Sequence, residues 1–200
     1  MIKLFLIISC ICLFLISGWF LLPRFLEQPK YKVIKKEGYF EVRSYSKFVI
    51  SSVLVSGSQY NSLRKGFRPL VKYISGKDRG GEKISMTAPV IQATTETKGN
   101  FKVSFSMPSK YRIDNLPKSE NTDISFEEVQ PSIAAVVWFR GKAKEEILVS
   151  KTNQLNEWII ANGYTAISKP KYLFYNDPST PGFLRRNEVL VIVEKYIKCF

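Results

Sequence analysis

The stretch that decides the fold of this chain is KISMTAPV, residues 83 to 90. Before it, apolar residues recur at intervals of three and four from Tyr60 to Ile74, and a glycine-rich turn from Gly76 to Gly81 follows them. That spacing predicts a helix with one buried face. Residues 83 to 94 are then predicted to form a strand. The next segment, Phe101 to Met107, alternates apolar and polar residues, which predicts a second, half-buried strand.

The remainder of the chain repeats this order. Upstream, Tyr39 to Val55 is rich in Val, Ile, Tyr and Phe, as expected of two strands or one long bent strand. The second half is predicted to contain extended structure from Ile124 to Phe139, a helix from about Lys144 to Asn162, and strands at Tyr172 to Tyr175 and Glu188 to Tyr196. Each short helix can bury only one face, so both helices are expected to pack on one curved antiparallel sheet.

The first 22 residues differ from the rest of the chain. No charged residue occurs from Leu4 to Leu22, and a helix needs about 20 apolar residues to cross a bilayer. Bulky residues at 19 to 22 stand where a cleaved signal would carry small ones. The sequence therefore predicts a transmembrane anchor or uncleaved signal over residues 1 to 22, a linker over 23 to 36 and one domain over 37 to 200. It predicts a single-pass membrane protein, with either side of the membrane open.

The charge of the chain limits its partners. A formal net charge of +13 implies an acidic neighbour, which is an anionic lipid surface beside residues 4 to 22, a carboxylate-bearing ligand or nucleic acid. No basic helix or aromatic RNA-binding signature favours nucleic acid. The chain contains no histidine, which excludes serine–histidine triads and histidine metal sites. We therefore predict a binding protein rather than an enzyme, and no metal site.

Five motifs resemble a known family. They are YFEVR at residues 39 to 43, the segment from Phe67 to Ile74, KISMTAPV, FKVSF at 101 to 105, and RRNEV at 185 to 189. In this order and spacing they resemble the SOUL haem-binding family over most of residues 31 to 196. The resemblance implies an α+β fold, a distorted and mostly antiparallel β-barrel of two β-α-β-β repeats with two packed helices. It also implies binding of a tetrapyrrole.

A haem site needs an apolar slot, basic groups for two propionates and, optionally, an axial ligand such as His, Met, Cys or Tyr. Without histidine, the family resemblance implies an open apolar groove that holds haem or a related hydrophobic anion weakly. Met86 lies where the family places pocket methionines beside the first helix. The predicted site residues are Met86, Lys83, Lys72, Phe67, Arg185 and Arg186, with the four basic residues as propionate partners. Core packing, solvated surface charge and local ion pairs are the alternative roles of these residues.

Two other functions remain open. One is an interaction or scaffold module that kept the fold and lost the ligand, which a groove packed shut would favour. The other is a small-molecule hydrolase or drug-binding domain, because the duplicated architecture is similar to that of gyrase-inhibitory-protein-like domains. Glu188 with Tyr175 or Tyr172 would then be the acting pair, and the carboxylate would have to line a pocket. Pairing of Glu188 with Arg186 at the start of a strand is the structural alternative.

Overall fold

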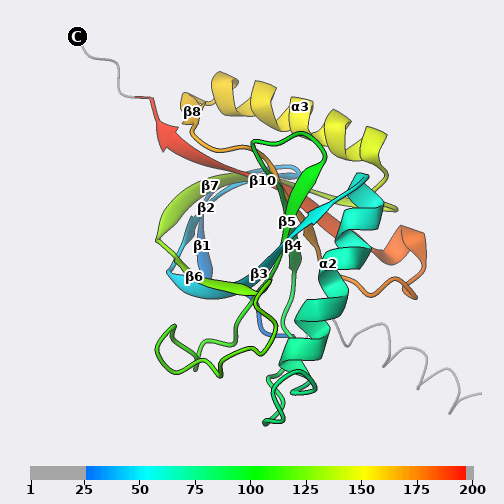
Figure 1. The fold of residues 1–200 in the computed structure, drawn as a ribbon. Helices are drawn as coiled ribbons and strands as arrows, with labels where there is room; N and C mark the ends of the chain where they lie inside the picture. The colour runs from blue at the N-terminus through cyan, green and yellow to red at the C-terminus, as the bar shows by residue number, and fades with distance from the viewer. Residues whose placement is uncertain (1–25, 197–200) are drawn as a thin grey trace, which may run out of the picture.

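A computed structural model describes residues 26–196 of the chain. In that part, one ten-stranded sheet carries two long helices (Figure 1). The elements in chain order are β1 (Tyr31–Glu37), β2 (Phe40–Tyr45), β3 (Phe48–Ser56), α2 (Gln59–Ile74), β4 (Val90–Thr94), β5 (Asn100–Ser106), β6 (Ser125–Val129), β7 (Ser132–Arg140), α3 (Glu145–Ala161), β8 (Tyr164–Ala166), β9 (Lys171–Phe174), the 3-10 helix η2 (Gly182–Leu184) and β10 (Arg186–Lys195).

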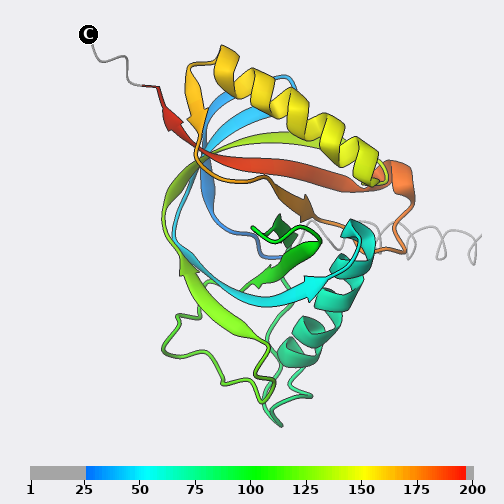
Figure 2. The same ribbon diagram turned by 45° about the horizontal axis from the view of Figure 1, so that its top comes forward.

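The strands pair in the order β1-β2-β7-β10-β9-β4-β5-β3-β6, and β8 pairs with the end of β10. Every pairing between these strands is antiparallel. The sheet curves strongly, and both helices lie on its outer face (Figure 2). The predicted α+β class and the two helices on an antiparallel sheet are therefore confirmed.

The predicted closure into a barrel is wrong. Within the described residues, β1 and β6 are the two ends of the strand order and do not pair with each other. Closure would require every strand to have a partner on both sides. Here β6 has only five residues, and an irregularity between Val33 and Lys35 interrupts the register of β1. Lysines along β1, at positions 32, 35 and 36, also disfavour further pairing of that edge.

Helix α2 covers β3 and β5 at very close range. Its buried residues include Ser62, Gly66, Leu70 and Tyr73, at the spacing of three and four that a one-sided helix requires. A Cβ placed on Gly66 would lie 2.5 Å from the Cβ of Val103 on β5. Glycine at this position therefore sets the distance between helix and sheet.

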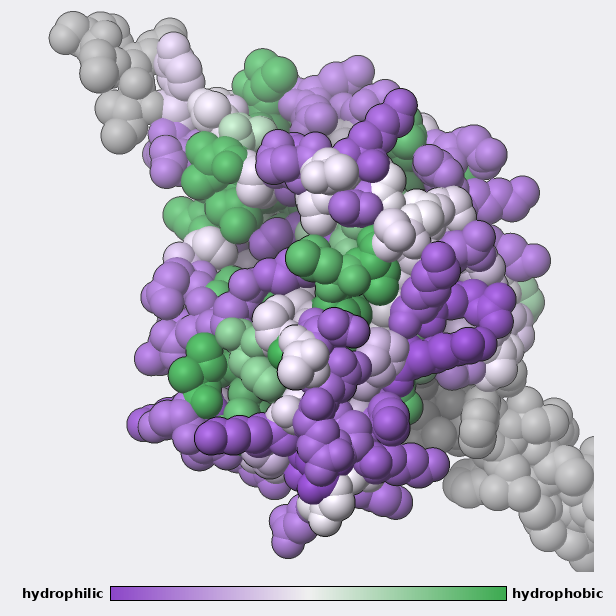
Figure 3. Space-filling model, in the orientation of Figure 1, coloured by the Kyte–Doolittle hydropathy of each residue, from purple (hydrophilic) through white to green (hydrophobic). Residues whose placement is uncertain are grey.

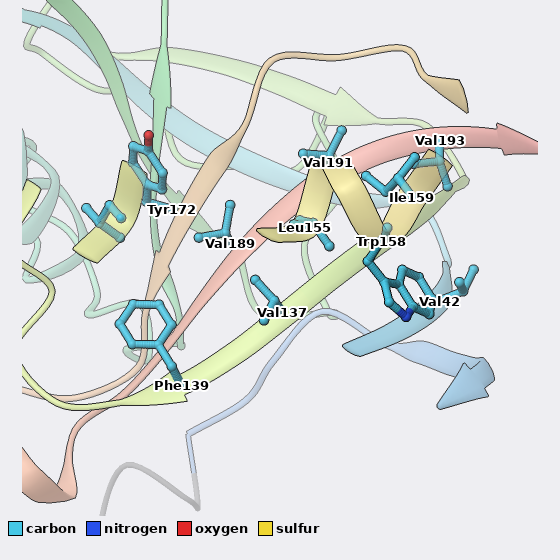
Figure 4. Packing of buried hydrophobic residues seen from close by; sticks show 12 residues of the cluster. Val42, Val137, Phe139, Leu155, Trp158, Ile159, Tyr172, Val189, Val191 and Val193 are labelled. Atoms are coloured by element: carbon cyan, nitrogen blue, oxygen red, sulfur yellow. The ribbon is translucent and has the colours of Figure 1, made fainter. Parts of the chain in front are cut away.

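Helix α3 packs on β7, β8 and β10, and Figure 4 shows the buried residues of this contact from close by. Leu155, Trp158 and Ile159 point from the helix onto valines of β2, β7 and β10. The ring of Trp158 also stacks on Phe40, with ring centroids 5.4 Å apart. The members of this buried cluster are Val42, Ala135, Val137, Phe139, Leu148, Leu155, Trp158, Ile159, Tyr172, Val189, Val191 and Val193.

Three pairings join the two halves into one sheet: β2 with β7, β3 with β6, and β4 with β9. The last runs from Val90 opposite Phe174 to Ala93 opposite Lys171. On the concave face, a separate buried cluster takes residues from both halves. It comprises Tyr45, Ala88, Ala134, Val136, Leu173, Tyr175 and Leu190. The inner face of the sheet is therefore a packed interior that belongs to both repeats.

Two local predictions need correction. The strand expected over residues 83 to 94 exists only as β4, because Pro89 has no amide hydrogen for a ladder and Ile84 donates its backbone N–H to Ile74 at 2.8 Å instead. Residues 31 to 36, expected in the linker, belong to β1 (Tyr31–Glu37). That strand is almost entirely exposed, so no apolar alternation marks it in the sequence. The division into segments at residues 22 and 36 otherwise stays a prediction.

No helix within residues 26–196 is both long enough and apolar enough to cross a membrane. This finding contradicts the predicted single-pass membrane localisation. Both α2 and α3 carry charged residues along their length, which makes such helices costly to insert into lipid. The segment on which the prediction was based, residues 4 to 22, lies outside the described residues.

Candidate functional site

Phe67 and Met86, two of the predicted site residues, lie on the same hydrophobic cluster between α2 and the sheet. Both side chains are partly buried, so each keeps one side toward solvent. The ring of Phe67 meets Phe105 edge to face, with centroids 5.4 Å apart. The structure therefore brings these two side chains to the margin of one apolar surface, which we call the α2 cluster.

Lys72 and Lys83 flank this cluster and are both exposed. Lys72 lies in the last turn of α2. Lys83 precedes Ile84, which is buried in the α2 cluster. In the part of the chain that the structure describes, neither lysine is within ion-pair distance of a carboxylate. Both ammonium groups are thus available to an anion.

Arg185 and Arg186, the other two predicted basic residues, are engaged elsewhere. The Nε of Arg185 donates to the carbonyl of Thr180 at 2.8 Å, and its Nη2 donates to the carbonyl of Pro178. Arg186, at the start of β10, donates from Nε to Glu188 at 3.1 Å and also from Nη2. Both guanidinium groups therefore hold their own loop and strand together.

A buried ionic cluster, formed by Glu41, Arg43, Tyr175, Arg186 and Glu188, lies in the sheet. Arg43 on β2 donates from Nη1 and Nη2 to the two carboxylate oxygens of Glu188 on β10, at 2.7 and 3.0 Å. Its Nε donates to Glu41 at 2.8 Å, and the Tyr175 hydroxyl donates to Glu188 at 2.8 Å. Arg43 and Glu188 have exposed fractions of 1% and 0%, so their pairing replaces the water that each has lost.

The pKa values in the buried ionic cluster follow from this pairing. Burial alone would raise the pKa of Glu188, but its hydrogen bonds and proximity to Arg43 lower it below the usual value. Burial likewise opposes the charge on Arg43, yet Glu188 raises the pKa of Arg43. Burial and the negative charge of Glu188 raise the pKa of Tyr175 well above its usual value. Glu188 is thus a carboxylate and Tyr175 a neutral phenol at neutral pH.

Of the two tyrosines proposed to act with Glu188, only Tyr175 contacts it. Tyr172 belongs to the cluster under α3, on the opposite face of the sheet. Both oxygens of Glu188 accept hydrogen bonds from arginine, and a carboxylate with a lowered pKa is a weak general base. The arrangement is therefore suited to holding strands together.

Glu41 and Arg43 were not singled out as functional residues from the sequence. A signal does exist, because Glu41, Arg43 and Tyr45 alternate with Phe40 and Val42 along β2, which places polar groups on one face of the strand. The spacing in the sequence does not show that Glu41 and Arg43 are buried. In residues 26–196, no three Cys, Asp or Glu side chains gather as metal ligands.

Comparisons with known proteins identify the family. The model of the SOUL heme-binding protein family matches residues 26–192. Heme-binding protein 2 of Homo sapiens is 28% identical over 169 residues, which cover 79% of each chain. Heme-binding protein 1 of Sus scrofa is 27% identical over 136 residues, covering 66% of this chain and 71% of the relative.

Two solved structures share the fold. The EcmrR C-terminal domain aligns with a TM-score of 0.61 at 15% identity, covering 82% of this chain and 98% of that domain. A hydrolase from Listeria innocua aligns with a TM-score of 0.56 at 9% identity, covering 80% and 94%. These identities establish a common fold and nothing more. The family match spans most of the chain, and on that basis this chain belongs to the SOUL heme-binding protein family.

Proposed function

We propose that this chain binds haem or a related tetrapyrrole, without catalysis and without histidine ligation, at the margin of the α2 cluster. One observation carries the proposal. Phe67 and Met86 present partly exposed apolar side chains on a single cluster, and Lys72 and Lys83, which have no carboxylate partner within the described residues, flank it. Membership of a family described as heme-binding supports this choice of ligand.

The chemistry of these side chains fits a tetrapyrrole. The macrocycle is flat and apolar, so it gains from covering Phe67 and Met86, while the propionates gain from the two ammonium groups. Haem supplies an iron centre that accepts soft donors, and the thioether of Met86 is such a donor. Each exposed lysine–carboxylate pair contributes about 0.2–1 kcal/mol. The ligand is therefore expected to be held weakly.

The test is a haemin titration of the purified full chain, followed by the Soret band. We expect a saturable shift, and an affinity about two- to fivefold lower in each of Lys72→Gln and Lys83→Gln, as one exposed ion pair is lost. Lys32→Gln, an exposed lysine on β1, is the matched control and should bind as the parent does. Met86→Leu keeps the volume of the side chain, so a change in Soret position would assign Met86 as a ligand of the iron.

Absence of a saturable shift at micromolar protein would contradict the proposal and favour the interaction or scaffold module. The hydrolase alternative receives no support from Glu188, since both of its oxygens are bound by arginine. We therefore propose no second function for the α2 cluster.

A further inference from the structure

A cleft of about 290 Å3 lies next to the KISMTAPV stretch, where residues 27 to 30 pass the start of β3 and the end of β5. None of the six predicted site residues lines it. Thr87 does, although the preceding residue, Met86, packs on the α2 cluster. Two consecutive residues of one stretch thus belong to two different places on the molecule.

The walls of this cleft are tied together by hydrogen bonds. The backbone N–H of Ala88 donates to the carbonyl of Glu27 at 2.9 Å, and the Glu27 carboxylate accepts from the backbone N–H of Ser109 at 2.7 Å. The hydroxyl of Thr87 donates to the carbonyl of Ser106 at 2.6 Å. The cleft is consequently built by contacts between three separate segments and does not depend on a ligand for its shape.

The charges that line the cleft are unequal. Of its two carboxylates, Glu128 lies 3.6 Å from the ammonium group of Lys47, whereas Glu27 accepts from the neutral backbone N–H of Ser109 and keeps its negative charge. Lys30 and Arg112 also line it, and neither is within ion-pair distance of a carboxylate in the described part of the chain. The lining thus holds three cationic side chains, Lys30, Lys47 and Arg112, against two carboxylates, so an anion entering the cleft would meet a net positive charge.

The cleft also offers apolar surface. Phe48, Met107 and Tyr111 line it and are at least partly buried. Small-molecule sites combine such walls with a few polar groups, and span roughly 300–1,000 Å3. The volume of this cleft, about 290 Å3, is just below that range, which suits a single small ring system better than a tetrapyrrole.

We propose that this cleft is a second ligand site, for a small aromatic anion whose ring packs on Phe48 and Tyr111 and whose charge meets Arg112 and Lys30. The planar guanidinium of Arg112 can bind a carboxylate, sulfonate or phosphate through two donors. The proposal goes beyond haem binding and does not depend on it.

The test uses two probes with the same aromatic rings, the anionic 8-anilinonaphthalene-1-sulfonate and the neutral N-phenyl-1-naphthylamine, added to the full chain. We expect saturable one-to-one binding of the anion, seen by fluorescence, with amide NMR shifts at Thr87, Tyr111 and Arg112. Arg112→Gln and Lys30→Gln should each weaken it about three- to tenfold. Lys98→Gln, an exposed lysine in the turn between β4 and β5, and Met86→Leu should leave it unchanged.

Three results would overturn the proposal. These are equal binding of the neutral probe, unchanged anion affinity in the Arg112→Gln Lys30→Gln double variant, or NMR shifts that gather at Phe67 and Met86. Because both substituted side chains are exposed, the variants should keep the parent's circular dichroism spectrum. A failed haemin titration with intact probe binding would reject only the haem proposal, and the reverse would reject only this one.

Discussion

Arg43 and Glu188 show how a single buried pair joins distant parts of this chain. They are 145 residues apart in sequence and share two hydrogen bonds in the interior. Burying two charges is costly, and the cost is recovered only while both partners are present. Tyr31 covers the other side of the guanidinium, with 4.4 Å from the Cζ of Arg43 to the ring centroid. Substitution of one member of this pair is therefore expected to lower the free energy of unfolding strongly.

Replacing Arg43 by Met should lower the free energy of unfolding by about 3 kcal/mol, because Glu188 then keeps a buried charge with only Arg186 and Tyr175 as partners. The Arg43→Met Glu188→Gln double variant should recover part of that loss, since it removes both charges. Urea unfolding of the parent, both single variants and the double variant gives the coupling free energy. Additive effects of the two substitutions would show that the pair is not coupled.

Stability should also depend on pH through Glu188. Its pKa is lower in the folded chain than its ordinary value of 4.5, so the unfolded chain binds the proton more readily. Its contribution is then complete above about pH 4.5 and is lost as pH falls through the folded-state pKa. Urea midpoints measured from pH 3 to 7 should fall steeply below pH 4.5 in the parent and less steeply in Glu188→Gln. Parallel curves would contradict this assignment.

At the scale of elements, Gly66 lies where α2 contacts β5, and replacing it by alanine would have two opposing effects on stability. Alanine has a helix propensity about 1 kcal/mol better than glycine, but its Cβ would lie 2.5 Å from that of Val103. Overpacking typically costs about 1–3 kcal/mol, so Gly66→Ala should be destabilising. Val103→Ala removes the two methyl groups, 2.7 and 3.1 Å from that Cβ, but keeps the Cβ of residue 103. It should therefore relieve part of the clash, and the double variant should be more stable than the sum of the single effects predicts.

Thermal unfolding of these variants checks that expectation. Asn61→Ala, at an exposed position on the same helix, is the matched control and should be neutral or slightly stabilising. A Gly66→Ala variant as stable as the Asn61→Ala variant would mean that the helix moves away from the sheet at little cost.

The helices were predictable to within a residue or two, because each has a regular apolar spacing and ends near a glycine, Gly76 or Gly163. β1 and β8 were not predicted. β1 is mostly exposed and β8 has three residues, so neither has a hydrophobic pattern of its own. Both exist because a neighbouring strand offers backbone donors and acceptors.

At the scale of the whole molecule, the pairings of β2 with β7, β3 with β6 and β4 with β9 predict that the two repeats unfold together. The face of the molecule in Figure 3 is mostly hydrophilic with scattered apolar patches. The buried cluster on the concave face takes residues from both repeats. Two independent units would instead need two separate cores.

Leu70 provides a test of this cooperativity. It is fully buried in the α2 cluster, and Leu70→Ala should cost about 2–5 kcal/mol. In a Trp19→Phe background, the remaining tryptophans, Trp138 and Trp158, both lie in the second repeat. Their fluorescence midpoint in urea should therefore fall together with the far-ultraviolet circular dichroism midpoint. An unchanged tryptophan midpoint would show that the repeats unfold separately.

The sequence by itself determined the types of most elements, the duplicated order and the family. These depend on local spacing and motifs, since the periodicity of buried side chains follows from the geometry of one helix or one strand. It also determined that no histidine is available to bind iron.

The tertiary structure alone decided the order of the strands, the open edges of the sheet and the cleft beside Thr87. Each depends on contacts between segments far apart in the chain, as Arg43 with Glu188 does across 145 residues. No local pattern encodes such a contact, because several strand orders can bury the same apolar faces and only one of them brings these charges together.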